Sequence, residues 1–189
     1  MSGTITASAQ SGLSQLFSDS LAESFRVTEL TLDINLVNDV SKMNEDEFIM
    51  LTVSSYTFKI FTLLHFTNNN ETKQYVAQAL KTSPDAMENN KFYDYLNEVG
   101  NTFCGAFKRE LGKYFPHTGM STPNLLEKGC LSHLNDIGFD YEAHYELKLK
   151  GLTSFYGSMY VASYSELDFH VPINSHLDDN VNTGALEMF

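Results

Sequence analysis

Residues 94–112, which read DYLNEVGNTFCGAFKRELG, decide the fold of this chain. An α-helix advances about 100° per residue, so each side chain can be assigned to a face. Large apolar residues of this region fall on one side and predict the core face of a long helix: Phe92, Leu96, Val99, Phe103, Phe107 and Tyr114. The polar and small residues opposite them fall within a sector of about 80° and predict an exposed strip: Asp94, Glu98, Asn101, Gly105, Lys108 and Gly112.

Two features of this exposed strip favour a contact surface. Gly105 and Gly112 each cost about 1 kcal/mol relative to alanine in a helix interior, so they indicate a face that another molecule approaches closely. Glu98 and Asn101 are three residues apart and therefore lie side by side. The carboxylate can pair with a cation, and the amide can orient a water molecule without acting as a base. Spacing alone does not distinguish this surface from an ordinary solvated helix face, which also carries Glu, Asn, Asp and Lys.

The segments at the start of the chain predict one helix and three strands. Apolar residues at spacings of three and four predict a helix over residues 13–25, and strict alternation predicts a half-buried strand over residues 29–36. Residues 48–66 are apolar on both faces. This pattern predicts two central strands joined by a turn at residues 54–57.

Helix start signals and a second alternating region complete the pattern. Residues 68–71 (Asn-Asn-Asn-Glu) cap a short helix that runs to residue 80 or 81. Ser83-Pro84-Asp85 is a start signal for the long helix. After a loop over residues 117–129, alternation returns and predicts three more strands: residues 141–150, 154–163 and 166–171.

The order α, β, β, β, α, long α, β, β, β predicts one α/β domain of the mixed α+β kind. Its sheet should have about six mostly antiparallel strands, with the long helix on the surface. We expect the domain to cover residues 13–173. Residues 1–12 are small and polar and predict a flexible N-terminal arm, and residues 174–189 predict a polar, acidic tail.

Composition excludes several functions. The chain has 12 basic and 24 acidic residues and a formal net charge of −12, which argues against nucleic-acid binding and against an anionic membrane surface. The N-terminus lacks the basic and apolar regions of a signal peptide, and no apolar stretch reaches the length of about eighteen residues that a membrane span needs. Cys104 and Cys130 do not make a disulfide framework. We therefore expect a cytoplasmic protein.

Other candidate sites are weaker than the helix. Cys130 and His133 form a lone Cys-x-x-His pair, whereas a zinc site needs about four ligands. Cys104 falls between the strip and the core face, which favours packing over a nucleophilic role. The sequence has no Gly-x-Ser-x-Gly elbow and no phosphate-binding glycine loop. No metal site and no cofactor of its own is predicted.

The helix also carries a family resemblance. The segment Asp94-Tyr-Leu-Asn-Glu98-Val-Gly-Asn101, followed by Ser121-Thr122-Pro123, resembles the CheC/CheX/FliY chemotaxis phosphatases. Their signature is Asp or Ser, three residues, Glu, two residues, Asn, and a later Pro, which Asp94, Glu98, Asn101 and Pro123 match. The chain has one copy of the motif, so it is most similar to CheX, and the resemblance implies the CheC-like fold.

This resemblance implies hydrolysis of the aspartyl phosphate on a phosphorylated CheY-like response regulator, in chemotaxis or two-component signalling. By analogy, Asn101 positions the attacking water and Glu98 pairs with the regulator's active-site lysine, which makes them the expected catalytic residues. Asp94, Gly105 and Lys108 are expected to bind the partner. The Mg²⁺ ion would belong to the regulator. Similarity to CheX also implies a homodimer, with the aromatic-rich C-terminal strands as a candidate pairing edge.

Two alternatives remain open on the sequence. The chain could be a non-catalytic CheC-like module that binds a response regulator or another signalling protein. It could also be a structural or ligand-binding domain in which Glu98 and Asn101 are incidental. Intact Glu98 and Asn101 favour the phosphatase over the binding module.

Overall fold

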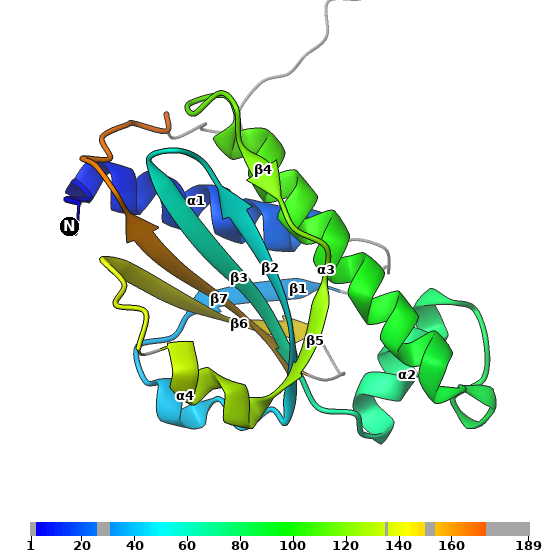
Figure 1. Cartoon of the computed structure of the whole chain (residues 1–189). Helices are drawn as coiled ribbons and strands as arrows, with labels where there is room; N and C mark the ends of the chain where they lie inside the picture. Colours follow the sequence, from blue (N-terminus) through cyan, green and yellow to red (C-terminus); the bar gives the residue numbers. More distant parts are fainter. Residues whose placement is uncertain (1–2, 26–30, 135, 150–153, 173–189) are drawn as a thin grey trace, which may run out of the picture.

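A mostly antiparallel sheet forms the centre of the fold (Figure 1). The computed structural model describes residues 3–25, 31–134, 136–149 and 154–172. Within these residues the sheet has seven strands in the order β1-β6-β7-β3-β2-β4, and β5 also pairs with β2. The strands are β1 (Leu32–Leu36), β2 (Glu47–Ser54), β3 (Phe58–Phe66), β4 (Gly119–Met120), β5 (Asn124–Glu127), β6 (Tyr141–Leu149) and β7 (Ser154–Ser163). Every strand pairing is antiparallel, which confirms the predicted α+β class.

Two long helices, α1 (Ala7–Ser24) and α3 (Asn89–Leu111), pack against each other and against one face of the sheet. The ring of Phe17 on α1 lies 4.9 Å from that of Phe103 and 5.5 Å from that of Phe107, both on α3. The short helix α2 (Asn70–Ala79) begins where predicted, because the side chain of Asn69 accepts a hydrogen bond from the Thr72 amide at 2.9 Å. This face of the sheet therefore holds the main hydrophobic core.

A smaller apolar cluster lies on the opposite face of the sheet. Phe48, Phe61 and Leu63 project from β2 and β3, and they pack against Leu134 of α4 (Leu131–Leu134). Alternation along the strands produces the two faces: on β3, Ile60 and Leu64 belong to the main core. The centre of the sheet is thus covered on both sides. The apolar residues on both faces of the two strands in residues 48–66 predicted this arrangement.

The N-terminal residues differ from the prediction of a flexible arm over residues 1–12. Residues 7–12 form the first turns of α1, with Thr6 as the N-cap, and Ile5 is buried. The amide of Thr6 bonds to the carbonyl of Leu167, and Ile5 forms a parallel bridge with the same residue. The folded domain therefore begins well before residue 13. The predicted tail, residues 174–189, lies outside the described residues.

Three further local predictions need correction. Ser83-Pro84-Asp85 begins a separate 3-10 turn (Pro84–Ala86), and the long helix begins only at Asn89. The two helical segments are separate because Met87 between them is buried and has an extended backbone. The predicted loop over residues 117–129 contains β4 and β5. The predicted strand over residues 166–171 is no strand, since its Leu167 makes only the isolated bridge to Ile5. None of the helices in the described ranges is long and apolar enough to cross a membrane.

Candidate functional site

The long helix α3 presents the predicted strip to solvent. Leu96, Phe103 and Phe107 are fully buried, and Asp94 and Glu98 are exposed. Asn101, Gly105 and Lys108 are half-buried. The predicted division of the helix into a core face and an outer face is therefore confirmed, with Asn101 and Lys108 less exposed than expected.

Three glycines of α3 and its C-terminus have different roles. A Cβ on Gly100 would lie 3.0 Å from Cγ2 of Ile49, so glycine allows the helix to approach β2 closely. A Cβ on Gly112 would lie 3.2 Å from the Lys108 carbonyl, at the C-cap of the helix. A Cβ on Gly105 would meet nothing within 4 Å among the described atoms. Gly105 is therefore the glycine that packing within this chain does not explain.

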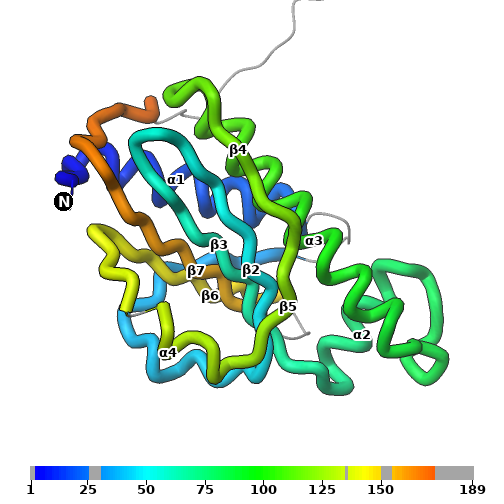
Figure 2. Tube along the Cα trace, in the orientation of Figure 1, coloured from blue at the N-terminus to red at the C-terminus, as the bar shows by residue number. Residues whose placement is uncertain are grey.

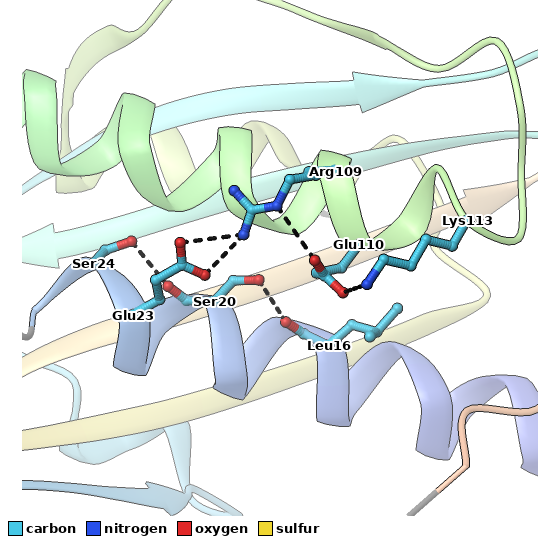
Figure 3. A network of polar contacts seen from close by, with 7 residues as sticks. All are labelled: Leu16, Ser20, Glu23, Ser24, Arg109, Glu110 and Lys113. Atoms are coloured by element: carbon cyan, nitrogen blue, oxygen red, sulfur yellow. Dashed lines mark hydrogen bonds and ion pairs between the residues drawn. The ribbon is translucent and has the colours of Figure 1, made fainter. Parts of the chain in front are cut away.

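An ion pair joins the C-terminal half of α3 to α1 (Figure 3). Nη2 of Arg109 donates to both carboxylate oxygens of Glu23, at 2.9 and 3.1 Å. Glu110 accepts from its neighbour Arg109 and from Lys113, which follows the end of α3. These groups are partly exposed, so each pair is worth about 1 kcal/mol or less. The buried aromatic rings between α1 and α3 therefore contribute most to the orientation of the helix, and these ion pairs add to it.

The outer face of α3 lacks such partners. The side chains of Asp94, Glu98 and Asn101 make no hydrogen bond and no ion pair with any described residue. A carboxylate and an amide that are three residues apart on a helix lie together on its surface. Glu98 and Asn101 are therefore both available to another molecule, and both are carried by a helix that the core holds rigidly.

The segment with the last motif residue runs beside this helix. After α3 the chain turns back and follows the helix through β4 and β5, with Pro123 between them (Figure 2). Ser121 fixes this segment to β2: its amide donates to the carbonyl of Thr52, and its hydroxyl accepts from the Thr52 amide, both at 3.0 Å. The structure thus brings the segment of Pro123 next to the helix that carries the other three motif residues.

The chemistry open to this surface is positioning and charge pairing. Asn101 has one acceptor and two donors at fixed geometry and cannot take a proton near neutral pH. Glu98 can attract a cation. Neither residue is placed like a nucleophile with an adjacent base, since neither has a hydrogen-bonded histidine or carboxylate within the described structure. The surface is suited to completing a reaction centre on another protein.

The cysteines do not supply an alternative site. Cys104 is fully buried, and burial raises the pKa of its thiol to about 11, so it is a packing residue. Cys130 packs beside the smaller apolar cluster. In the described part of the chain, no three residues among the His, Cys, Asp and Glu side chains are grouped closely enough to hold a metal ion.

One polar group was not predicted from the sequence. His65, His144 and Ser158 form a buried hydrogen-bonded group on the sheet face opposite α1 and α3. They come from three different strands, β3, β6 and β7. The alternation of side chains along each strand assigns each of the three residues to a face, but it does not predict their contact.

Comparison with known proteins identifies the fold. No protein-family model matches the sequence, and no curated protein is similar to it. A CheC-like superfamily protein from Shewanella sp. PV-4 superposes with a TM-score of 0.62 at 15% identity, covering 80% of this chain and 97% of that chain. CheX from Vibrio vulnificus gives a TM-score of 0.62 at 12% identity, covering 79% of this chain and 99% of that chain.

A third similar structure is the CheX–CheY–BeF3–Mg²⁺ complex from Borrelia burgdorferi. Its TM-score is 0.60 at 11% identity, over 80% of this chain and 98% of that chain. These likenesses show that the chain has the CheC-like fold, and they confirm at the level of fold the resemblance to the CheC/CheX/FliY group.

Proposed function

We propose that this chain is a phosphatase for the aspartyl phosphate of a CheY-like response regulator. The observation that carries the proposal is the pair of an exposed Glu98 and a half-buried Asn101 on the long helix of a CheC-like fold, both unpaired among the described residues. The solved CheX–CheY complex supports the choice of partner, because its CheX component has the same fold as this chain.

In the proposed mechanism, α3 docks against the phosphorylated regulator and places Asn101 beside the phosphoryl group. An acyl phosphate is already reactive, so its hydrolysis needs mainly a water molecule in line and neutralisation of charge. The Asn101 amide orients that water, and the Mg²⁺ of the regulator supplies the charge neutralisation. Glu98 pairs with the active-site lysine of the regulator and fixes the docking register.

The remaining strip residues shape the contact. Gly105 has open space where a Cβ would be, so the regulator can approach the helix backbone there. Asp94 and Lys108 are the first and last charged residues of the strip, and their charges are opposite. We infer that they set the orientation of the partner along the helix, because complementary charges fix register more than they add affinity.

The alternative is a CheC-like module that binds a response regulator without dephosphorylating it. It shares the docking surface and differs only in the role of Asn101. Phosphate release from a phosphorylated CheY-like regulator therefore separates the two. We expect wild-type protein to accelerate release and Asn101→Ala to lower the rate on the order of 10²-fold, with the regulator affinity little changed.

Gln78→Ala is the matched control, because Gln78 is an exposed amide on α2, away from the strip. It should dephosphorylate the regulator as fast as wild type. If Asn101→Ala also matches wild type, the water-positioning role is wrong and the binding module takes its place.

We also propose a homodimer, as the likeness to CheX suggests. The structure changes the expected pairing edge: β6 lies between β1 and β7, and β7 lies between β6 and β3, so neither C-terminal strand is free. The edge on that side is β1, where Leu36 is 58% exposed. A dimer formed by strand pairing would therefore use β1.

A further inference from the structure

A cavity of about 310 Å³ lies over the sheet face opposite α1 and α3, away from the strip. The segment that leads into β2 and the short helix α4 cover it, while the sheet forms its floor. Its lining combines apolar side chains with an unusual number of ionisable ones: Val40, Met43, Glu45, His65, Lys128, Leu131, Ser132, Glu142, His144 and Tyr160. A volume of this size is at the lower end of small-molecule sites.

Two buried histidines on the floor are fixed by one serine. The hydroxyl of Ser158 on β7 lies 2.8 Å from Nε2 of His65 and 2.9 Å from Nδ1 of His144. Ser158 is fully buried, and the exposed fractions of His65 and His144 are 3% and 6%. Burying a polar side chain without a hydrogen bond costs free energy, and the serine supplies a hydrogen bond to each ring. Here the serine holds both rings rigid beneath the cavity.

The single hydroxyl determines what the two rings offer. Burial lowers the pKa of both histidines, that of His65 to about 3, so both rings are neutral near pH 7. A neutral ring has one donor and one acceptor nitrogen, and the hydroxyl can donate to only one of the two rings. At least one ring therefore donates to the hydroxyl oxygen, which can accept from both rings. At least one outer ring nitrogen is then an acceptor.

Glu142 indicates which outer nitrogen is the acceptor. Its Oε2 lies 4.0 Å from the outer nitrogen of His144, Nε2, which favours the proton on that nitrogen. The outer nitrogen of His65, Nδ1, is then the acceptor. It has no hydrogen-bond partner among the described residues, although His65 is almost fully buried and lines the cavity.

A second acceptor at the cavity lacks a partner. Glu45 lines the cavity, and its Oε2 has no hydrogen bond within the described structure. Burial raises the pKa of this carboxyl. Lys128 is the lining ammonium, and its Nζ already donates to the carbonyl of Met43 at 3.2 Å. Because Glu45 and Glu142 both line the cavity, its carboxylates outnumber its ammonium groups.

We propose that this cavity is a binding site for a small primary ammonium compound with a short alkyl chain. The ammonium donates hydrogen bonds to Nδ1 of His65 and to the carboxylate of Glu45, both of which line the cavity. The alkyl chain packs against Val40, Met43 and Leu131. A charged donor matches this site because hydrogen bonds to charged groups are the strong ones, at about 1.5–3 kcal/mol each.

The experiment is a titration of the full chain followed by NMR of the imidazole ring signals, with n-butylammonium as the probe. We expect saturable shifts of the His65 and His144 signals and no comparable shift of His117, which is exposed in the segment between α3 and β4. Tetramethylammonium, which has the same charge but no N–H donor, should leave all three unchanged at equal ionic strength.

Two isosteric variants complete the test. Glu45→Gln should weaken n-butylammonium binding about tenfold or more, which corresponds to one charged hydrogen bond. Glu127→Gln removes an equal charge from the exposed strand β5 and should bind as wild type does. Shifts that grow linearly with concentration, equal responses to both cations, or unchanged binding by Glu45→Gln would each overturn the proposal and leave a cavity that holds only water.

Discussion

Gly100 of α3 and Ile49 of β2 are in such close contact that a Cβ on Gly100 would lie 3.0 Å from the Cγ2 atom of Ile49. Ile49 is fully buried, and its branched side chain has little rotational freedom. This contact sets the distance between the helix and the sheet. Because Gly100 is the immediate neighbour of Asn101, the contact also sets the height of the candidate site above the core.

Gly100→Ala should therefore destabilise the protein. Alanine is the better helix former by about 1 kcal/mol, but forcing an extra methyl into a packed core costs about 1–3 kcal/mol. We expect a net loss of about 1 kcal/mol in the free energy of unfolding, measured by urea denaturation. A gain in stability would show that α3 shifts away from Ile49 without strain.

Gly105→Ala should have the opposite effect on stability. No described atom lies within 4 Å of the added Cβ, so only the helix propensity changes. We expect a gain of about 0.5–1 kcal/mol in the free energy of unfolding. Affinity for the regulator should fall, because the methyl group occupies the proposed contact surface. Unchanged affinity in a titration by calorimetry would place Gly105 outside the interface.

Local periodicity predicted α3 well because the faces of a helix depend only on spacing along the chain. The same rule missed β4 and β5, since Gly119–Met120 and Asn124–Glu127 are too short to alternate and are strands only because β2 offers them an edge. Ile5 was missed for a similar reason. Its burial depends on Leu167, at the other end of the chain.

The pair Glu98 and Asn101 and the buried group of His65, His144 and Ser158 differ in the same way. Glu98 and Asn101 could be paired from the sequence because helical spacing brings them together. His65 and Ser158 are 93 positions apart, and their contact depends on the register between β3 and β7. Alternation assigns a strand residue to a face, but it does not determine which residue lies opposite it.

The buried histidines predict a loss of stability in mild acid. Burial lowers the pKa of His65 from 6.5 to about 3, so the unfolded chain binds a proton that the folded chain excludes. The stabilisation is complete above pH 6.5 and is lost as the pH falls toward 3. At pH 5, His65 alone should cost about 2 kcal/mol relative to neutral pH.

Urea denaturation at pH 7.5 and at pH 5 measures this effect. His133→Asn should show the same dependence as wild type, because His133 is exposed and has no buried partner to lose. A free energy of unfolding that stays constant across this range would mean that His65 is protonated in the folded protein.

The proposed homodimer predicts sensitivity at β1. Light scattering should give the mass of a dimer for wild type and of a monomer for Leu36→Lys, because a lysine on an exposed edge strand opposes strand pairing. Leu80→Lys is the control, since Leu80 is 43% exposed at the end of α2. A monomeric wild-type protein would argue against the dimer, and a dimeric Leu36→Lys would exclude this edge.

Glu98 should act on partner binding through its charge. Glu98→Gln keeps the size and helix propensity of the side chain but removes the attraction to a lysine of the regulator. We expect slower association, weaker affinity and a smaller dependence of affinity on salt, because interfacial charges act mainly through long-range attraction. Glu166→Gln, at an exposed position outside α3, removes the same charge from the molecule and should change neither rate nor salt dependence. Surface plasmon resonance at several salt concentrations measures all three quantities. Equal behaviour of the two variants would show that Glu98 contributes only to the net charge and does not anchor the partner.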